Sequence, residues 1–343
     1  MNIKLEILNI STMEKIDTQK IFKIYDNWPK IAEKSFNSNI KNEDFNNINH
    51  IVFVGMGGSG TIGDIFESIL SKKKIYVNVV KGYLLPKTVD HNTLVVVVSV
   101  SGNTAETLSV LKSAKKLESK IIAFCSGGKM KKYCDKNNIK YKIIPKFHSP
   151  RATLPSYLYT ILKVLHKTLK IKEDDIHESI KEIKKLSEKI NSSNLKNKNT
   201  ALDLANWIKT IPVIYYPLGL QSVAIRFKNS LQENSKMHVL TENVIEASHN
   251  GIVSWEKKSD ILPILIRGYD DQETTKQRWI ILKEYLEYKK IEYQEIVSEK
   301  GNILTKIICM IYLLDYSSIY LAINRKVDPT PVKAIDFVKN KLK

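Results

Sequence analysis

Three hydroxyl side chains follow an unbroken run of apolar residues at Leu94–Val98 and could together bind an anion. They belong to Ser99, Ser101 and Thr104. The turn also contains Gly102, and Asn103 and Glu106 have the spacing of a capping box, which predicts the start of a helix. Turn hydroxyls and the free N–H groups of a helix N-terminus form a cradle that suits a phosphate group. The same residue types also serve as plain helix caps, which is the structural alternative.

We expect such a cradle to hold the phosphate of a small metabolite, because a nucleotide-binding P-loop is longer and ends in a Lys that is missing here. A second loop, Gly55–Gly60, follows the apolar run Ile51–Val54 and matches the Gly-x-Gly-x-x-Gly pattern of dinucleotide folds. The next predicted strand ends at Lys81, where an NAD site places an acid for the ribose. These glycines are therefore expected only to bring backbone close to a ligand. The predicted binding residues of this loop are Gly57 and Gly58, and Ser59 supplies one more hydroxyl.

Three further side chains could supply a cation, a base and an imidazole. Arg151 stands between a strand end and an apolar helix, so it could bind substrate oxygens or be a surface charge. Glu233 falls off the apolar stripe of its helix, near the helix end, where it could be a general base or a solvated carboxylate. His249 lies in a turn and could act in catalysis or belong to a surface loop.

The chain has 343 residues and a formal net charge of +18. Its lysines are scattered over predicted helix faces with acidic residues between them, and no nucleic-acid-binding motif accompanies them. We therefore expect a solvated basic surface that attracts anionic substrates, with no nucleic-acid partner. No apolar stretch approaches the length of a membrane helix, and Met1–Leu8 has no signal-peptide core, which predicts a cytoplasmic protein without a membrane partner. The three cysteines have the spacing of neither a disulfide framework nor a zinc site.

Strands that alternate with helices predict an α/β fold with doubly wound parallel sheets. The expected strands are Ile51–Val54, Ile75–Val80, Leu94–Val98, Lys120–Cys125, Lys140–Ile144, Pro212–Tyr216, Ile261–Ile266 and Glu292–Val297. The alternation of strands and helices starts again after a charge-dense helix, and Gly219 occupies the position in the second half that Gly55 has in the first. This indicates a divergent duplication whose second half lacks the hydroxyl cradle. We expect an N-terminal domain at 1–170 with a lead-in helix, a helical connector at 171–200, and a C-terminal domain at 201–343 with a helical tail.

Six motifs occur together and in order. They are Gly55-Met-Gly-Gly-Ser-Gly60, Ser99-Val-Ser-Gly-Asn-Thr104, Ser149-Pro-Arg151, Gln232-Glu-Asn-Ser-Lys236, Glu246-x-x-His249-Asn250 and Asp328-Pro-Thr-Pro-Val332 with the following Lys339. In this the chain resembles the bifunctional phosphoglucose/phosphomannose isomerases, two-domain members of the sugar isomerase (SIS) superfamily. The resemblance covers nearly the whole length, except 171–201, and implies two SIS-type αβα domains.

The resemblance implies an aldose–ketose isomerase that interconverts glucose 6-phosphate and mannose 6-phosphate with fructose 6-phosphate through a cis-enediolate. It implies that Glu233 is the base, that Arg151 holds the enediolate oxygens, and that His249 and Lys339 assist ring opening, with His249 reaching in from the partner subunit of a homodimer. It also implies that the 6-phosphate is bound by the hydroxyls of Ser59, Ser99, Ser101 and Thr104. The resemblance implies no metal and no organic cofactor.

Two other functions stay open on the sequence. Sugar isomerase domains also serve as non-catalytic sugar-phosphate sensors, although these normally add a DNA-binding domain, for which this sequence has no signature. An amino-sugar phosphate isomerase would use the same phosphate cradle. Formation of fructose 6-phosphate from glucose 6-phosphate and from mannose 6-phosphate separates these alternatives.

Overall fold

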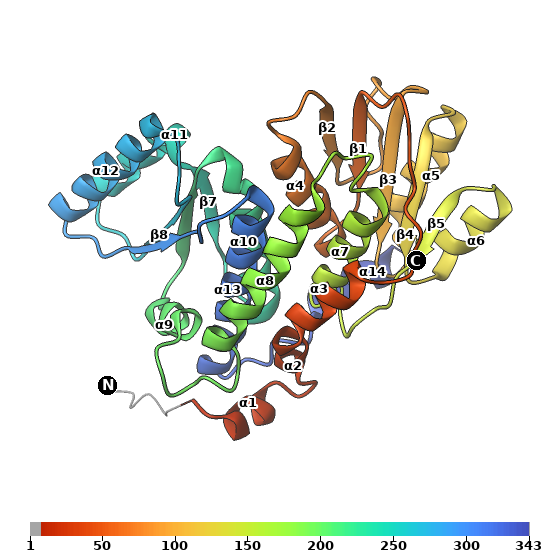
Figure 1. Cartoon of the computed structure of the whole chain (residues 1–343). Helices are drawn as coiled ribbons and strands as arrows, with labels where there is room; N and C mark the ends of the chain where they lie inside the picture. The colour runs from red at the N-terminus through yellow and green to blue at the C-terminus, as the bar shows by residue number, and fades with distance from the viewer. Residues whose placement is uncertain (1–7, 343) are drawn as a thin grey trace.

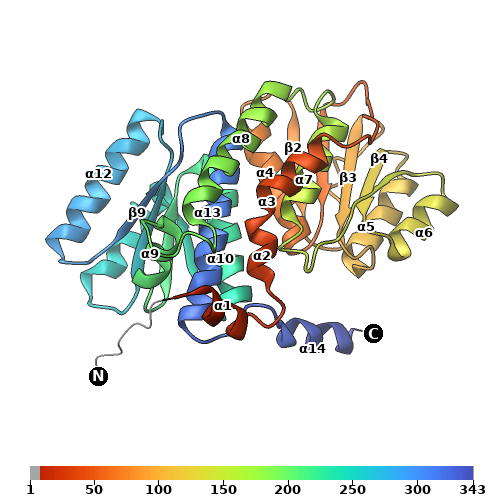
Figure 2. The same cartoon turned by 60° about the horizontal axis from the view of Figure 1, so that its bottom comes forward.

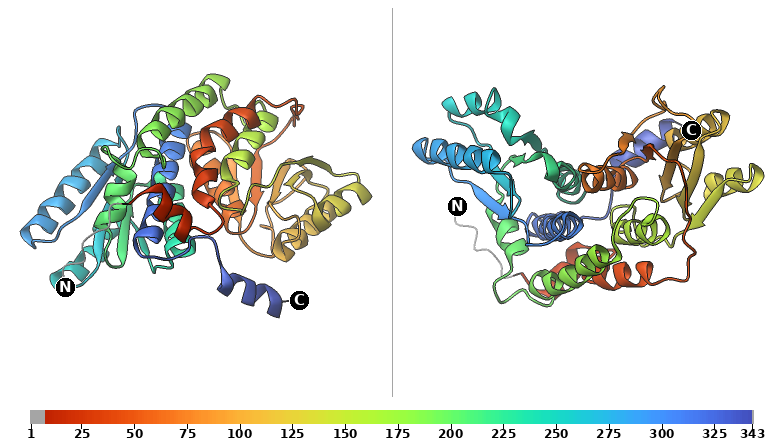
Figure 3. Two further views of the ribbon diagram at one scale, coloured as in Figure 1. Left: turned by 90° about the horizontal axis from the view of Figure 1, so that it is seen from below. Right: turned by 45° about the horizontal axis from the view of Figure 1, so that its top comes forward.

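The computed structural model describes residues 8–342, so the signal-peptide prediction at Met1–Leu8 falls outside the described residues except for Leu8. Two parallel sheets stand on either side of a central layer of helices (Figure 1), and Figure 3 shows the same arrangement from two further directions. The structure therefore has the doubly wound α/β architecture that the alternation of strands and helices predicts.

The first sheet has five parallel strands in the order β2-β1-β3-β4-β5. They are β1 (His50–Val54), β2 (Tyr76–Val80), β3 (Thr93–Ser99), β4 (Lys120–Cys125) and β5 (Lys140–Ile143). Helices α4 (Gly58–Leu70), α5 (Ala105–Lys116), α6 (Gly128–Lys136) and α7 (Leu154–Leu165) follow β1, β3, β4 and β5. Every residue of β1 and β3 is buried, as in parallel sheets covered on both faces. The strands predicted for this half are confirmed.

The second sheet has four parallel strands in the order β7-β6-β8-β9. They are β6 (Pro212–Tyr216), β7 (Leu240–Asn243), β8 (Leu262–Arg267) and β9 (Gln294–Val297). Its helices are α9 (Thr200–Trp207), α10 (Gln221–Ser235), α11 (Val244–Ala247), α12 (Glu273–Tyr288) and α13 (Ile303–Asn324), with 3₁₀ turns at Leu218–Leu220 and Gly251–Glu256. The order repeats that of the first four strands, in agreement with a duplication. The edge strand β7 was not predicted, because four residues of which none is buried give no apolar pattern.

Alternate residues of the central strands enter different cores. In β3, Val96 and Val98 belong to the same core as α3 (Trp28–Phe36), α4 and α7, whereas Val95 and Val97 belong to the core of α5 and α6. The strands of the second sheet divide in the same way, and Ile214 of β6 joins the core that Val96 occupies. One continuous core therefore fills the space between the sheets, and each sheet is the middle of an αβα sandwich. This confirms the predicted fold class.

The charge-dense helix α8 (Glu173–Ile190) packs against α13 and against α3. Its apolar side chains are buried in the central core, as their helical spacing predicts. They are Ile176, Ile180, Ile183, Leu186 and Ile190. The connector is thus part of the layer between the sheets, and the boundaries at 170 and 200 remain a prediction.

The lead-in segment consists of three helices in place of the one we expected. These are α1 (Ile10–Ile16), α2 (Ile21–Asp26) and α3. The first break occurs because the buried carboxylate of Asp17 accepts a hydrogen bond from the backbone N–H of Phe22. Pro29 in the first turn of α3, a position that proline favours, marks the second break.

Helix α13 corrects one expectation. Among the described residues it is long and apolar enough to cross a membrane by length and composition, although the sequence analysis expected no such stretch. In the structure, 89% of its most apolar window is buried inside the molecule. The helix is apolar on all sides because it is packed on all sides, between α8, α9 and α10.

The C-terminal helix α14 (Lys333–Lys341) is exposed, whereas α13 is buried. It projects from the body of the molecule (Figure 2), and none of its residues is buried in the described chain. Ile335, Phe337 and Val338 nevertheless present apolar side chains to solvent, with Phe337 64% exposed. This helix has an apolar face that the single chain leaves uncovered.

Candidate active site

The predicted phosphate cradle lies at the carboxyl edge of the first sheet, in the loops that follow β1 and β3. These neighbouring strands form the switch point of a sheet in the order 2-1-3-4-5, where such folds bind ligands. The two loops contact each other, because Ser59 Oγ accepts a hydrogen bond from Val100 N at 3.3 Å. Gly57 has a φ of 54°, which favours glycine, and starts α4. Gly58 lies so close to Pro150 that a Cβ atom there would be 3.3 Å from its backbone.

The hydroxyls after β3 are held by their own loop. Ser99 Oγ lies 3.1 Å from Thr104 Oγ1, and Ser101 Oγ accepts from Asn103 N at 3.2 Å. Ser101 is exposed and Thr104 half-buried, whereas Ser99 is buried. Gly102 is required between them, because its φ is 65° and a Cβ would lie 1.9 Å from the carbonyl oxygen of the loop after β4. The backbone therefore presents these hydroxyls together at the sheet edge.

The predicted capping box is wrong. The residue that caps α5 is Thr104, one position later than expected, and its side chain makes no capping hydrogen bond. Asn103 instead turns away, and its Oδ1 accepts from Lys129 N in the first turn of α6 at 3.0 Å. Within residues 8–342, the first N–H groups of α5 therefore have no side-chain acceptor, which is the arrangement that an anion site at a helix N-terminus uses.

At the end of β2, Lys81 forms an ion pair with Asp64 of α4 at 2.6 Å. Burial raises the pKa of the Asp64 carboxyl, and the charge of Lys81 acts against that rise. The cation that stands where a dinucleotide fold places its ribose-binding acid is therefore engaged with the helix after the glycine loop.

Arg151 is buried, with 3% of its surface exposed, in the turn before α7. Its guanidinium makes four hydrogen bonds to the second half of the chain. The acceptors are Asn234 Oδ1 for Nε (2.7 Å), Glu233 Oε2 for Nη1 (3.1 Å), and the carbonyl oxygens of Pro329 (2.8 Å) and Thr330 (3.1 Å) for Nη2. A guanidinium has five N–H groups, so one N–H on Nη1 has no partner within the described residues. Arg151 is thus a fixed cation with one donor to offer, not a surface charge.

Glu233 lies in the last turn of α10 and is 26% exposed. It lines a cavity of about 640 Å³ at the junction of the glycine loop, the end of α10 and the start of α14. The lining residues are Gly57, Asn229, Gln232, Glu233, Lys236, Pro331, Val332, Lys333, Ala334 and Ile335. The structure therefore brings a carboxylate and the glycine loop of the cradle to one cavity, and Arg151 contacts that carboxylate from outside the lining.

Two predicted site residues lie elsewhere in the single chain. His249 is exposed in the turn after α11, and Lys339 is exposed on the projecting helix α14. Neither lines the cavity, and neither touches a residue of the cradle in the hydrogen bonds or ion pairs of the described chain. Their expected roles therefore depend on a contact that one chain does not make. Of the other predicted site residues, Gly57 and Glu233 line the cavity, whereas Arg151 and the cradle hydroxyls lie outside its lining.

Sequence reasoning gave no role to several residues around Arg151, although two of them, Asn234 and Lys236, stand in the motif Gln232–Lys236. Asn234 binds the Arg151 guanidinium, and the Lys236 ammonium donates to the carbonyl oxygens of Glu233 and Pro329. Burial, and next the charge of Arg151, lower the pKa of Lys236. A second buried ion pair, Arg226 with Asp315, lies behind them. One signal was present, since Asp315 is the single carboxylate in the otherwise apolar run that becomes α13.

His148 lies close to the site, three residues before Arg151. Both of its ring nitrogens are buried without a hydrogen-bond partner in the described chain, and its φ is 46°. Burial, and next the positive charge of Arg151, lower the pKa of the imidazole. The charges of Asp17 and Asp328 act in the other direction. His148 is thus held in an environment that favours its neutral form.

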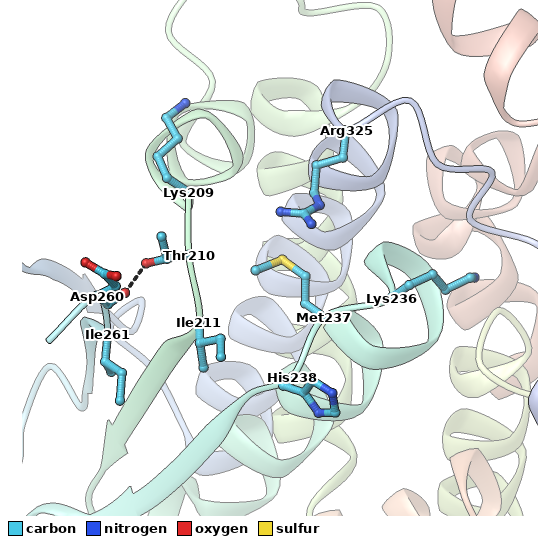
Figure 4. A pocket seen from close by; sticks show the side chains of 9 residues that line it. All are labelled: Lys209, Thr210, Ile211, Lys236, Met237, His238, Asp260, Ile261 and Arg325. Atoms are coloured by element: carbon cyan, nitrogen blue, oxygen red, sulfur yellow. Dashed lines mark hydrogen bonds between the residues drawn. The ribbon is translucent and has the colours of Figure 1, made fainter.

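A second cavity, of about 340 Å³, lies at the edge of the second sheet where β6 and β8 begin (Figure 4), and Lys236 lines both cavities. Lys209, Lys236, His238 and Arg325 give the second cavity a basic lining, and Met237 lies among them. None of the site residues predicted from the sequence lines it. In parallel sheets of this type ligands bind at the carboxyl ends of the strands, so the cavity at Glu233 is the better candidate.

Comparisons with known proteins identify the family of the chain. The family described as "Bacterial phospho-glucose isomerase C-terminal SIS domain" matches residues 197–342, and the SIS domain family matches residues 44–146. The bifunctional phosphoglucose/phosphomannose isomerase of Caldicellulosiruptor bescii is 37% identical over 320 residues, which cover 90% of this chain and 93% of the relative. The D-glucosamine-6-phosphate 4-epimerase of Sulfolobus acidocaldarius is 29% identical, over 74% of this chain and 79% of the relative.

Among solved structures, a hypothetical protein of Thermus thermophilus has a TM-score of 0.70 at 14% identity, over 97% of this chain and 89% of that one. The C-terminal domain of glucosamine-fructose-6-phosphate aminotransferase from Francisella tularensis has a TM-score of 0.66 at 15% identity, over 89% and 96%. These likenesses concern the fold alone. With the sequence relatives, the two sheets and the cavity at Glu233, they lead to one conclusion: the chain belongs to the family of bifunctional phosphoglucose/phosphomannose isomerases.

Proposed function

We propose that this enzyme interconverts glucose 6-phosphate and mannose 6-phosphate with fructose 6-phosphate, with Glu233 as the base. The observation that carries the proposal is the contact between Glu233 and the buried Arg151 beside the cavity that Gly57 also lines. The names of the sequence relatives supply the substrates. Sugar phosphates are anionic, which suits a chain with a net charge of +18.

The reaction moves one proton between two carbons. In the proposed mechanism, the Glu233 carboxylate takes the proton from C2 of the open-chain aldose and returns it to C1, while a second proton passes from O2 to O1. Negative charge develops on both oxygens of the enediolate between these steps. The free N–H on Arg151 Nη1 lies on the same nitrogen that binds Glu233, so the cation can donate to an enediolate oxygen next to the base.

The phosphate cradle holds the other end of the substrate in this proposal. Ser59, Ser99, Ser101 and Thr104 bind the 6-phosphate together with backbone N–H groups of α5, and Gly57 and Gly58 let the chain approach it. Ser59 Oγ accepts from Val100 N, and the hydroxyls of Ser99 and Thr104 bind each other. Each of these hydroxyl hydrogens can turn toward a phosphate oxygen, because a hydroxyl rotates to suit its acceptor.

We also propose that the enzyme is a homodimer whose active sites are shared, and that it acts in the cytoplasm. In support, His249 and Lys339 lie outside the cavity, and α14 leaves an apolar face uncovered. A second copy could cover that face and bring His249 to the cavity, where it would assist ring opening with Lys339. A twofold interface would supply the same contact to both sites.

Two assays test this proposal. Formation of fructose 6-phosphate is measured in a coupled assay, with glucose 6-phosphate and mannose 6-phosphate as separate substrates. Turnover of neither substrate would refute the isomerase, and fructose 6-phosphate binding without turnover would favour a sensor. Turnover of glucosamine 6-phosphate alone would favour an amino-sugar enzyme.

The shared site is tested by mixing two inactive variants, Glu233→Gln and His249→Ala. If His249 acts in the partner's site, some heterodimer sites contain both native residues, and activity returns to about a quarter of the wild-type level after statistical exchange. Each variant mixed with itself is the control. A heterodimer verified by mass spectrometry that recovers no activity would reject the shared site.

A further inference from the structure

One face of α10 carries a row of polar side chains at intervals of four residues. Arg226, Ser230 and Asn234 are each at most 2% exposed, so the row is buried between α10, α13 and the turn of Arg151. Buried polar groups are retained where each has a partner. The row therefore raises the question of what its hydrogen bonds hold in place.

At the cavity end of the row, the direction of every hydrogen bond follows from chemistry. The hydroxyl of Ser318 in α13 donates to the carbonyl oxygen of Asp315 at 2.6 Å, so its oxygen is left to accept. Asn234 Nδ2 donates to that oxygen at 2.8 Å, and Asn234 Oδ1 then faces Arg151 Nε at 2.7 Å. A guanidinium N–H can only donate, so Arg151 requires the amide oxygen of Asn234 on its side. Ser318 has only its oxygen to offer as an acceptor and requires the amide nitrogen on the other side, so both contacts fix the same orientation. The amide of Asn234 is not free to flip.

The other end of the row holds the backbone of the same arginine. Arg226 Nη2 donates to the carbonyl oxygen of Arg151 at 2.8 Å. Asp315 anchors Arg226, with its two carboxylate oxygens 3.1 and 3.0 Å from Arg226 Nε. Ser230 Oγ also donates to Asp315, at 2.5 Å. Helix α13 thus fixes both the main chain and the side chain of Arg151 through α10.

We infer that Asn234 and Ser318 are positioning residues that aim the free N–H of Arg151 Nη1 at the substrate oxygens beside Glu233. The inference rests on the proposed isomerase function. Asn234, Ser318 and Arg151 all lie outside the cavity lining, and of the three only Arg151 contacts Glu233 by a hydrogen bond within residues 8–342, so the effect of the other two on the reaction passes through Arg151. Glu233 and two carbonyl oxygens hold the Nη atoms, and the hydrogen bond at Nε adds a fixed point at the stem end of the guanidinium. Small changes in the position of such a group can lower a reaction rate strongly.

Adjacent serines of α13 provide a matched test. Ser317 and Ser318 are both 0% exposed, and each donates to a carbonyl oxygen of its own helix, Leu313 and Asp315 respectively. Ser318 also accepts from Asn234, an interaction that Ser317 does not make in the described chain. Replacing either serine by alanine removes a buried hydroxyl, but only Ser318→Ala removes the partner of Asn234.

We expect Ser318→Ala to lower kcat about 10-fold with KM changed less than about 2-fold, and Asn234→Ala to lower kcat about 100-fold. Ser317→Ala should leave both constants within about 2-fold. Calorimetric titration with fructose 6-phosphate measures the fraction of intact sites. Because kcat is then calculated per intact site, unfolded protein does not lower it. Ser318→Thr, which keeps the hydroxyl, should restore kcat to within about 3-fold of wild type, and Asn234→Asp should retain more activity than Asn234→Ala because it still accepts from Arg151.

Equal kcat values for Ser318→Ala and Ser317→Ala would overturn the inference, as would a wild-type kcat for Asn234→Ala. If the wild-type protein turns over none of the sugar phosphates, the proposed function fails, and crystal structures of the two serine variants then decide the positioning role. We expect the Arg151 guanidinium to be displaced in Ser318→Ala and unchanged in Ser317→Ala. An unchanged guanidinium in both variants would reject the inference whatever the activity.

Discussion

Replacement of Glu233 by Gln is the most direct test of the proposed base. The substitution keeps the size of the side chain and an oxygen that can accept from Arg151 Nη1, as the carboxylate does at 3.1 Å. It removes only the negative charge and the ability to take a proton. The change therefore separates the chemistry of the residue from its structural contacts.

The structure gives different magnitudes for stability and for rate. The Glu233 side chain is 26% exposed, but Arg151 is buried and its three other acceptors are uncharged, so the lost charge should cost about 1–2 kcal/mol. At an unfolding entropy of about 2.1 cal/mol/K per residue, that corresponds to a fall in Tm of roughly 1.5–3 °C for a chain of 343 residues. A positioned general base contributes about 100-fold or more to the rate, which is about 2.7 kcal/mol of activation free energy.

Two measurements are needed, kcat in the coupled assay and exchange of the C2 proton of glucose 6-phosphate with D₂O. We expect Glu233→Gln to lose both while it still binds fructose 6-phosphate. Glu295→Gln is a matched control, because Glu295 is 28% exposed and contacts Arg267 Nη1 at 2.6 Å in the second sheet, away from the cavity. Retention of more than about a tenth of the wild-type rate by Glu233→Gln would refute its role as base.

Two further predictions concern the neighbourhood of the site. Replacing Ser101 and Thr104 together by Ala should raise KM by about 100-fold or more, because hydrogen bonds to a charged group contribute about 1.5–3 kcal/mol each, while these partly exposed hydroxyls contribute little to stability. A fall in Tm with unchanged KM would instead favour a purely structural role for the two hydroxyls. Burial lowers the pKa of His148 from its usual 6.5, so the unfolded chain takes up the proton first and the free energy of unfolding should decrease as the pH falls below about 6.5. His148→Asn, which tolerates the left-handed backbone, should show a smaller decrease between pH 7.5 and 5.5 in urea titrations, and equal decreases would contradict this explanation.

Local sequence determined the sheets and their loops. A run such as Leu94–Val98 buries both faces, so it predicts a central parallel strand without any knowledge of its neighbours. Gly102 and the hydroxyls around it marked the turn that follows, because a left-handed φ strongly favours glycine. The strand order then required the glycine loop and the hydroxyl turn to meet at one edge.

The short and polar elements needed the tertiary structure. The edge strand β7 exists because it pairs with β6, and its own four residues give no apolar pattern. The cap of α5 shifted to Thr104 because the first turn of α6 supplies a donor to Asn103, a partner 26 residues away in the sequence. In each case a long-range partner overrode the local preference.

The candidate site also depends partly on local sequence and partly on tertiary structure. Residue types and motif spacing singled out Arg151 and Glu233, but the sequence alone could not distinguish a surface charge from a fixed cation. That distinction comes from the hydrogen bonds that Asn234 and the carbonyl oxygens of Pro329 and Thr330 make to the guanidinium across 83 to 179 positions of sequence. Such long-range hydrogen bonds leave no periodic pattern in the local sequence, because they form only when the turn before α7, the end of α10 and the segment at Pro329 and Thr330 meet in the folded chain.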